Sequence, residues 1–352
     1  MEIIQGIWAR LARGFSVLAP MEDVTDTVFR QIIREAGAPD LLMTEFTSTD
    51  GLCSVARAKV VGRLRFEQKE KPLVAQIWGT RPENFLRVAR EVREMGFDGL
   101  DINMGCPVRK ITRGGGCGAL INNPSLAAEL IAAAREGAGS IPVSVKTRIG
   151  VTKPVPEEWL GFLLSQGIAA LTVHGRTVSQ QSEGLADWGA ISLAVKLRDQ
   201  AGVSTRVVGN GDVKTPETFR RRLQETGVDG IMIGRGVFEN LFLFRAVRED
   251  GAAQPVAGNH VLSDYSHLAP RQKVQYFRDH VAFHRSTWGE RGNFNVLKKF
   301  AKTYLRTFAG ARDLIDAVMH TRRYAEGLDV LDSWLAAHER TAGESREESI
   351  AG

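Results

Sequence analysis

The feature that most constrains the fold is a repeated alternation of short apolar runs with longer segments of helical spacing. The eight apolar runs are Phe15–Ala19, Leu41–Glu45, Leu73–Ile77, Gly99–Asn103, Val143–Lys146, Ala170–His174, Arg206–Gly209 and Gly230–Gly234. Helical segments such as Pro82–Met95 and Ser125–Arg135 fall between them. Buried parallel strands that alternate with helices indicate an α/β fold, and eight such repeats are typical of a (β/α)8 TIM barrel. A doubly wound sheet is the alternative, but no glycine fingerprint follows the first run.

Most of these runs end on residues that can take part in chemistry or approach a ligand. The residues at or just after the run ends include Met21, Glu45, Gln76, Asn103, Lys146, His174, Asn210 and Arg235. In a barrel, the carboxyl ends of all strands meet on one face, and this face carries the active site. The sequence therefore predicts one site built from many strand ends.

A second domain is expected after the barrel. The composition changes near Gly251, where residues 251–258 are rich in Gly, Ala, Gln and Pro, as in a linker. Helical spacing without a strand pattern then occurs at Arg271–Arg285, Asn293–Phe308, Ala311–His320 and Arg323–Ala337. We expect a barrel domain over residues 1–250, a small all-helical domain over 259–340, and a disordered tail over 341–352.

The overall composition excludes several classes of protein. Hydrophobic residues make up 43% of the chain and charged residues 25%, which is ordinary for a soluble globular enzyme. The three cysteines include no Cys-x-x-Cys pair, which argues against a disulfide framework or a zinc ribbon. No apolar run reaches the roughly 18 residues of a membrane span, and residues 1–13 lack the apolar core of a signal peptide. We therefore expect a cytoplasmic protein with neither a membrane span nor a metal site.

The fourth run continues into the most distinctive motif. Residues 101–107 read Asp-Ile-Asn-Met-Gly-Cys-Pro, and a glycine-rich turn follows at 114–119. Further motifs stand at the other strand ends: Ala19-Pro20-Met21, Val145–Arg148, Val173–Thr177, Gly209–Asp212 and Ile233–Gly236. In this order and spacing, over residues 14–245, they resemble the tRNA-dihydrouridine synthases. The helical part resembles the family's C-terminal domain more loosely, through Leu297–Phe300 and Tyr304.

The resemblance implies an oxidoreductase that reduces the C5=C6 bond of a specific uridine in tRNA to 5,6-dihydrouridine. Side chains supply no hydride, so a redox cofactor must. In the resembled family this cofactor is FMN, reduced by NADPH, with the hydride passing from flavin N5 to uracil C6. The resemblance makes Cys106 the proton donor to C5, and a thiol pKa of about 8.5 is suitable for an acid near neutral pH.

The same resemblance assigns the cofactor contacts. The expected FMN-binding residues are Ala19, Pro20, Met21, Gln76, Lys146, His174, Asn210, Gly211, Asp212, Gly234 and Arg235. Lys146 is placed where a cation stabilises negative charge on the reduced ring, and Gln76 would hydrogen-bond its polar edge. Barrels often bind phosphate with the loops after strands seven and eight, where glycine N–H groups and Arg235 are available here. A buried core histidine is the alternative for His174, and no second ligand stands at metal-binding spacing.

Substrate contacts are expected in both domains. Asn103, Arg148 and Arg176 are the candidates for holding the uracil, although Arg176 has the flavin phosphate as an alternative partner. The base must be flipped out to reach a barrel mouth. Residues 265–325 hold twelve Lys or Arg against four Asp or Glu, and Lys298 and Lys299 are expected to grip the tRNA backbone. By the same resemblance, we expect a monomer.

Three alternatives stay open from the sequence. Cys117, eleven residues after Cys106, is either a packing substitution or a second catalytic thiol. The protein is alternatively a small-molecule pyrimidine flavoenzyme of the dihydroorotate dehydrogenase type, which needs no basic helical domain. The third alternative is a noncatalytic RNA-binding protein on a barrel, which would bind tRNA without flavin.

Overall fold

The computed structural model describes residues 6–249 and 264–347 of the chain. Contacts divide the chain into two compact units. One comprises Met1–Val237 with Leu243–Gly251, and the other comprises Phe238–Phe242 with Ala252–Gly352. The two units are described separately below.

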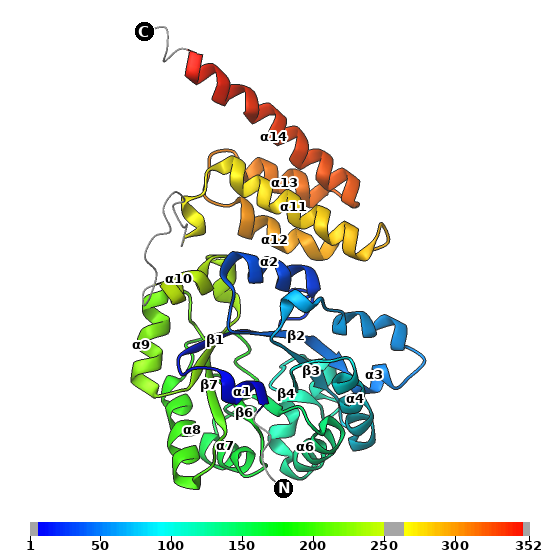
Figure 1. Cartoon of the computed structure of the whole chain (residues 1–352), viewed down its shortest axis with the longest axis vertical. Coiled ribbons are helices and arrows are strands. Elements are labelled where there is room, and N and C mark those ends of the chain that lie inside the picture. Colours follow the sequence, from blue (N-terminus) through cyan, green and yellow to red (C-terminus); the bar gives the residue numbers. More distant parts are fainter. Residues whose placement is uncertain (1–5, 250–263, 348–352) are drawn as a thin grey trace. The chain divides into compact units, whose positions relative to one another are not determined.

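The first unit is a closed barrel of eight parallel strands in sequence order (Figure 1). The strands are β1 (Phe15–Leu18), β2 (Leu41–Ser48), β3 (Leu73–Trp78), β4 (Gly99–Met104), β5 (Val143–Arg148), β6 (Ala170–His174), β7 (Arg206–Asn210) and β8 (Gly230–Ile233). The barrel closes where β1 pairs with β8, with Phe15 opposite Gly230. The predicted TIM barrel is confirmed, and β2 and β5 extend beyond the predicted apolar runs, to Ser48 and to Arg148.

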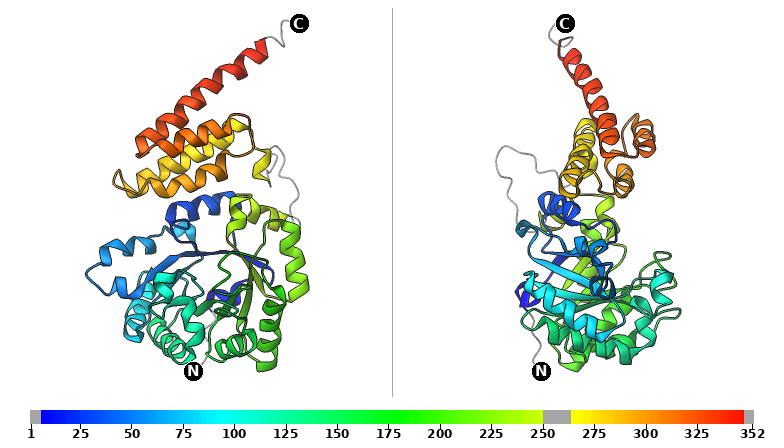
Figure 2. Two further views of the ribbon diagram at one scale, coloured as in Figure 1. Left: turned by 180° about the vertical axis from the view of Figure 1, so that it is seen from behind. Right: turned by 90° about the vertical axis from the view of Figure 1, so that its right-hand side faces the viewer.

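Helices lie outside the strands, as Figures 1 and 2 show. They are α2 (Thr27–Gly37), α3 (Thr49–Leu52), α4 (Pro82–Glu94), α5 (Arg109–Thr112), α6 (Pro124–Ala138), α7 (Pro156–Leu164), α8 (Trp188–Ala201), α9 (Pro216–Thr226) and α10 (Leu243–Glu249). Short 3-10 helices are η1 (Arg57–Lys59), η2 (Val61–Leu64), η3 (Gln68–Glu70), η4 (Cys117–Asn122) and η5 (Arg235–Phe238). Local sequence sets several helix starts: Asn123 caps α6 before a proline, and Thr215 does the same for α9.

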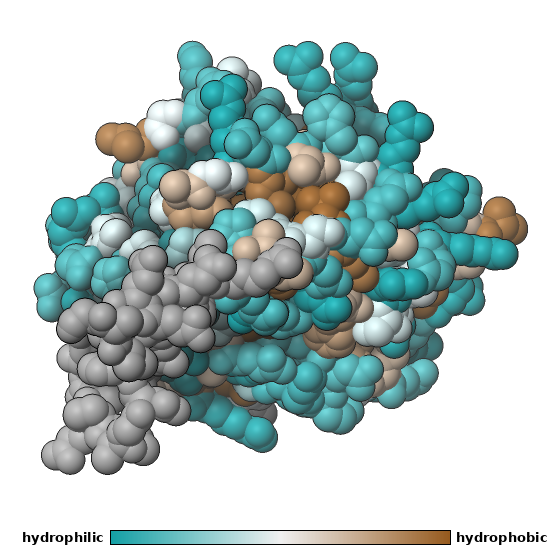
Figure 3. Space-filling model, turned by 90° about the horizontal axis from the view of Figure 1, so that it is seen from above, coloured by the Kyte–Doolittle hydropathy of each residue, from teal (hydrophilic) through white to brown (hydrophobic). Residues whose placement is uncertain are grey.

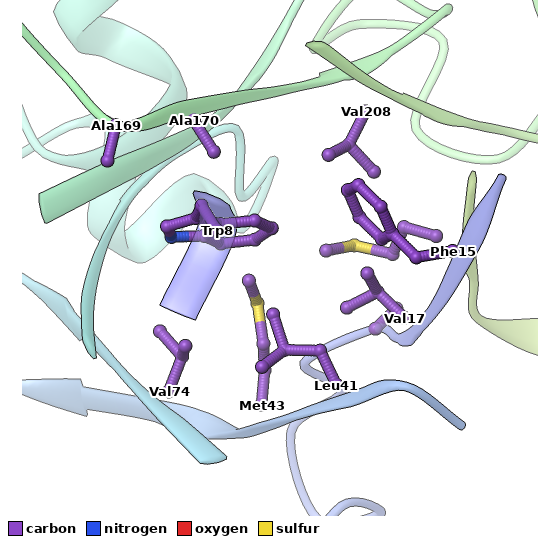
Figure 4. Packing of buried hydrophobic residues seen from close by; sticks show 11 residues of the cluster. Trp8, Phe15, Val17, Leu41, Met43, Val74, Ala169, Ala170 and Val208 are labelled. Carbon is purple, nitrogen blue, oxygen red and sulfur yellow. The ribbon is translucent and has the colours of Figure 1, made fainter. Parts of the chain in front are cut away.

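The end of the barrel opposite the strand carboxyl ends is closed by the short helix α1 (Gly6–Arg10). Its Trp8 is fully buried in a cluster with Phe15, Met43, Val74 and Ala170 (Figure 4). The rings of Trp8 and Phe15 have centroids 6.1 Å apart. The indole Nε1 of Trp8 has no hydrogen-bond partner in the described part of the chain, so its contribution comes from packing alone.

The second unit is helical. It contains η6 (Tyr265–His267), α11 (Pro270–Trp288), α12 (Asn295–Leu305), α13 (Ala311–His320) and α14 (Tyr324–Glu347). The helix α14 continues to Glu347, into the segment 341–352 that the sequence assigns to a tail, and residues 348–352 lie outside the described residues. On the face that Figure 3 shows, hydrophilic residues predominate and hydrophobic ones gather near the centre. None of the described helices is long and apolar enough to cross a membrane.

Aromatic and histidine side chains form the centre of this helical unit. His280 and His284, one turn apart on α11, are buried, and their Nδ1 atoms lie 3.1 Å from the Tyr304 hydroxyl and 2.8 Å from the Tyr324 hydroxyl. Burial, and secondarily the neighbouring His284, lowers the pKa of His280 to about 3. The folded protein therefore holds His280 neutral at pH values where an unfolded chain would protonate it.

Acid should for this reason destabilise the helical unit. Above the ordinary histidine pKa of about 6.5 His280 has no effect on the pH dependence, because it is neutral in both states. Between that value and the folded pKa of about 3, the free energy of unfolding should fall by up to about 1.4 kcal/mol per pH unit. Urea denaturation of the full chain at several pH values, followed by circular dichroism, measures this slope.

The replacement His280→Gln should reduce the slope. Equal slopes in the wild type and in His280→Gln would show that this histidine does not couple folding to protonation.

Candidate active site

A cavity of about 250 Å³ lies over the carboxyl ends of the barrel strands. It is lined by Ala19, Pro20, Met21, Lys146, Arg148, His174, Arg176, Gln181, Ser182, Asn210, Gly211, Asp212, Val213, Lys214, Met232, Ile233, Gly234, Arg235 and Gly236. Strand register brings these residues together from distant parts of the sequence. Arg148 on β5 stands opposite His174 on β6, and His174 stands opposite Asn210 on β7.

The cavity is strongly cationic. Five of its lining residues are Lys or Arg, whereas Asp212 is its single carboxylate. Lys146 has no hydrogen bond or ion pair with any described residue, and burial together with Arg148 lowers its pKa to about 8. Burial and four surrounding cations, Lys146 first among them, also lower the pKa of His174, so its ring stays neutral. An unpaired ammonium in such a cavity is costly, and an anionic ligand would relieve this cost.

The β7 and β8 loops form one side of the cavity. Asp212 accepts two hydrogen bonds from Arg176, at 2.6 and 2.7 Å, and lies 3.9 Å from Arg235. A side chain at Gly236 would place its Cβ 2.2 Å from the backbone oxygen of Val213, so only glycine fits there. Because Arg235 is more than half exposed and only distantly paired, its guanidinium is available to an anion at this side.

The two arginines predicted to hold the uracil are bound by the protein's own backbone. Arg148 donates from Nε to the Gly105 carbonyl at 2.7 Å and from Nη1 to the carbonyls of Thr177 and Gln181. Arg176 donates to the Glu183 and Gly184 carbonyls in addition to its bonds with Asp212. These side chains fix the loops around the cavity, and a contact with the uracil stays a prediction.

A buried polar network lies beneath the cavity. Gln76 donates through Nε2 to Asp101 at 2.7 Å and accepts through Oε1 from Asn103 Nδ2 at 2.9 Å. Ser144 Oγ donates to the second oxygen of Asp101 at 2.6 Å. Burial raises the pKa of Asp101 to about 6, although its hydrogen bonds with Ser144 and Gln76 oppose the shift. The sequence assigns no role to Asp101, because its pairing with Gln76 depends on the register between β3 and β4.

This network orients the loop that carries Cys106. The Oδ1 atom of Asn103 accepts from the backbone N–H groups of Gly105 at 3.0 Å and Cys106 at 2.9 Å. Arg148 holds the Gly105 carbonyl from the opposite side. The Cys106 thiol is half-buried, and its pKa falls to about 7, chiefly through a hydrogen bond with the Cys117 side chain and also through the N–H of Val108. Such a thiol is half ionised near neutral pH and is well suited to give up a proton.

The structure thus brings together most of the residues predicted from the sequence. All of the predicted cofactor-binding residues except Gln76 line the cavity, as do Arg148 and Arg176. Gln76 and Asn103 lie in the buried network, and Cys106 lies on the loop that this network orients. Lys298 and Lys299 belong to α12 of the helical unit. No group of three or more His, Cys, Asp or Glu among the described residues is arranged to hold a metal.

The fold and this site define a class of protein, a (β/α)8 barrel with a cationic cavity at the carboxyl ends of its strands. Among solved structures, a 2-naphthoyl-CoA reductase in complex with 2-naphthoyl-CoA has a TM-score of 0.54 at 11% identity. The match covers 68% of this chain and 50% of that one, and it supports the barrel fold alone.

Sequence comparison then identifies the family. The model of the dihydrouridine synthase family matches residues 17–339. A probable tRNA-dihydrouridine synthase 2 of Bacillus subtilis is 41% identical, over 94% of this chain and 97% of that protein. A probable tRNA-dihydrouridine synthase of Staphylococcus epidermidis is 39% identical over the same shares. The chain therefore belongs to the dihydrouridine synthase family.

Proposed function

We propose that this protein reduces the C5=C6 bond of a specific uridine in tRNA to 5,6-dihydrouridine, with FMN as cofactor and NADPH as electron donor. The observation that carries the proposal is the cationic cavity over the strand ends, whose lining residue Arg148 donates to the carbonyl of Gly105, the residue before Cys106. The names of the curated relatives and the matched family support the substrate.

The residues of the cavity fit a flavin nucleotide with one phosphate. Arg235 and the glycine-containing loops after β7 and β8 would hold the phosphate, and the unpaired Lys146 would face the ring system. Ala19, Pro20 and Met21, at the end of β1, would pack against the ring. When bound and reduced, the flavin would supply the hydride for uracil C6.

Cys106 would deliver the proton to uracil C5. Its S–H bond breaks as the new C–H bond forms, and the electron pair of the S–H bond stays on sulfur. The hydrogen bond with Cys117, the N–H of Val108 and the charge of Arg148 all favour the resulting thiolate. Stabilisation of the thiolate as it forms lowers the free-energy barrier to proton transfer.

The uracil itself would be held by Asn103, Arg148 and Arg176. One N–H of the Asn103 amide is used by Gln76, which leaves the second as a donor for the base. Arg148 and Arg176 would act mainly through the loops that they fix, because most of their donors are already bound to protein oxygens. The uridine must leave the base stack of the tRNA to reach these groups.

The helical unit would bind the tRNA backbone. Lys299 and Lys302 are exposed on α12, and Lys298 donates to the Met319 carbonyl at 2.9 Å. A hollow of about 570 Å³ in the same unit is lined by cations that include Lys302 and Arg312. These positive groups suit phosphates, whose neutralisation releases counterions. We also propose that the protein acts as a monomer in the cytoplasm.

The double replacement Lys298→Glu and Lys299→Glu should weaken tRNA binding while NADPH oxidation by the bound flavin stays intact. If each lysine neutralises one phosphate, the slope of log Kd against log salt concentration should fall by about two. Filter binding at several salt concentrations measures this slope. The pair Lys196→Glu and Arg221→Glu, exposed on α8 and α9 of the barrel, makes the same change in net charge and serves as the control. Equal losses of tRNA affinity in the two double variants would show that the α12 lysines do not bind the tRNA backbone.

A reconstituted assay tests the proposed reaction. The purified protein, given NADPH and a tRNA transcript that lacks modifications, should form dihydrouridine at a defined position, detected by mass spectrometry of nuclease fragments. Free uracil and dihydroorotate should give no turnover. Turnover of these small molecules with none on tRNA would instead favour the pyrimidine flavoenzyme, and tRNA binding without flavin would favour a noncatalytic protein.

A further inference from the structure

Asp101 is a buried carboxylate on β4 that the proposed function does not use. Its side chain is fully buried, as are those of Gln76 on β3 and Ser144 on β5, and the strand register places Asp101 opposite both residues. Gln76 Nε2 donates to one carboxylate oxygen at 2.7 Å, and Ser144 Oγ donates to the other at 2.6 Å. Hydrogen bonds from both neighbouring strands therefore hold this carboxylate in one orientation.

A chain of hydrogen bonds runs from this carboxylate to the backbone of Cys106. Gln76 uses its amide nitrogen to donate to Asp101 and its amide oxygen to accept from Asn103 Nδ2 at 2.9 Å. The amide oxygen of Asn103 accepts in turn from the N–H groups of Gly105 at 3.0 Å and Cys106 at 2.9 Å. Each hydrogen bond in the chain thus depends on the way in which the preceding amide faces.

The two ends of this chain allow only one direction. The pKa of Asp101, about 6, leaves its carboxylate mostly ionised at neutral pH, and an ionised carboxylate only accepts, so Gln76 must turn its nitrogen toward it. A backbone N–H only donates, so Asn103 must turn its oxygen toward Gly105 and Cys106. Reversal of either amide would leave buried donors or acceptors unsatisfied.

We propose that Asp101 is a positioning residue for the reaction, whose carboxylate fixes the direction of the Gln76–Asn103 chain and thereby holds the loop that carries Cys106. This inference rests on the proposed function. Asp101 acts through the two amides and takes no part in the proton transfer itself. The same direction leaves one N–H on each amide without a partner among the described residues, and each is suited to donate to a carbonyl oxygen of a bound ring.

Three replacements separate the direction of the chain from the charge at its end. Asp101→Ala removes the acceptor, and Gln76→Met breaks the chain one link further on while it keeps the volume of the side chain. Asp101→Asn keeps an oxygen for Gln76 and turns its amide nitrogen toward Ser144. The Ser144 hydroxyl already lies 3.4 Å from the Leu100 carbonyl and can donate there instead. Thr172→Val is the control, since the buried Thr172 hydroxyl has no partner in the part of the chain that the structure describes.

The first readout is alkylation of Cys106 by iodoacetamide in the full chain supplied with FMN. Peptide mass spectrometry measures its rate relative to that of Cys53, which follows α3. The ratio should rise by about threefold or more in Asp101→Ala and in Gln76→Met, because the loop opens more often when the chain is broken. Asp101→Asn and Thr172→Val should keep the wild-type ratio. A general loss of stability would instead raise both rates together.

The second readout is single-turnover reduction of tRNA. The rate should fall by about tenfold to a hundredfold in Asp101→Ala, as is typical when a reacting group is displaced, whereas the Kd for tRNA should stay unchanged. Asp101→Asn should recover most of the rate. A wild-type alkylation ratio in either Asp101→Ala or Gln76→Met would overturn the proposal, so one of them decides if the other does not fold. An Asp101→Asn protein as slow as Asp101→Ala would also contradict it.

The alkylation readout needs neither tRNA nor NADPH, so failure of this inference can be distinguished from failure of the proposed function. A wild-type ratio in the broken-chain variants of a protein that reduces tRNA removes the role of Asp101 alone. A wild-type protein that forms no dihydrouridine removes the proposed function, and with it the use of the chain in proton delivery, whatever the alkylation ratio.

Discussion

Replacement of Cys106 by alanine is expected to lower the single-turnover rate of uridine reduction by about 10²–10⁴-fold, the usual contribution of a positioned general acid. The bound flavin should be retained, because Cys106 is not among the residues that line the mouth cavity. The bound flavin should also continue to oxidise NADPH, since that step requires no proton from Cys106. The measurement is rapid mixing of the reduced protein with tRNA, followed through flavin absorbance and dihydrouridine content.

The controls for this experiment are two other cysteine replacements. Cys53→Ala should behave as the wild type, because Cys53 lies outside the site. Cys106→Ser keeps the shape of the side chain but supplies a much weaker acid, so it should be nearly as slow as Cys106→Ala. An unchanged rate in the Cys106→Ala protein would show that Cys106 is not the proton donor and would make Cys117 the next candidate.

The largest expected effect on stability is that of Trp8→Ala. The indole is fully buried at the closed end of the barrel, and its removal leaves a cavity that the surrounding strands can fill only in part. The free energy of unfolding should fall by about 3–5 kcal/mol, as is typical for the loss of a buried aromatic side chain. Urea denaturation followed by circular dichroism measures the change.

Trp8→Phe is the matched control, because it retains a ring and removes the Nε1 group that has no partner among the described residues. Its cost should be well below that of alanine, since the unsatisfied N–H disappears along with part of the packing. Equal and small effects of both replacements would show that the helix α1 does not contribute to the stability of the barrel.

The barrel could be predicted from the sequence because its strands are buried on both faces. A strand such as Gly230–Ile233 is therefore a continuous apolar run in the sequence, and eight mostly apolar runs at regular intervals are compatible with few other folds. The closure by Trp8 could not be predicted in this way. Its helix has five residues, and its partners come from strands far along the chain.

The residues of the site could be predicted where each stands at a strand end, as His174 and Asn210 do. The hydrogen-bond partners of these residues could not be predicted, because they depend on strand register and on side-chain rotamers. Gln76 bonds Asp101 and Asn103 in the interior, although the sequence suggested only a contact with the flavin. The hydrogen bonds from Arg148 to main-chain carbonyls could not be predicted either, because every residue has a main-chain carbonyl whatever its side chain.

The relation between the two thiols shows this limit most clearly. Cys106 and Cys117 are separated by a glycine-rich turn whose path the sequence does not define. The structure turns this segment back so that the N–H of Gly118 donates to the Cys106 carbonyl at 3.3 Å.

Mapping of dihydrouridine in tRNA from cells with and without the gene tests whether this protein makes the modified nucleoside. The map should be made at the level of individual positions, since related enzymes in the same cell could modify others. We predict that dihydrouridine disappears from at least one defined position without the gene and returns when the wild-type protein, but not Cys106→Ala, is supplied. An identical map in both cells would contradict the account.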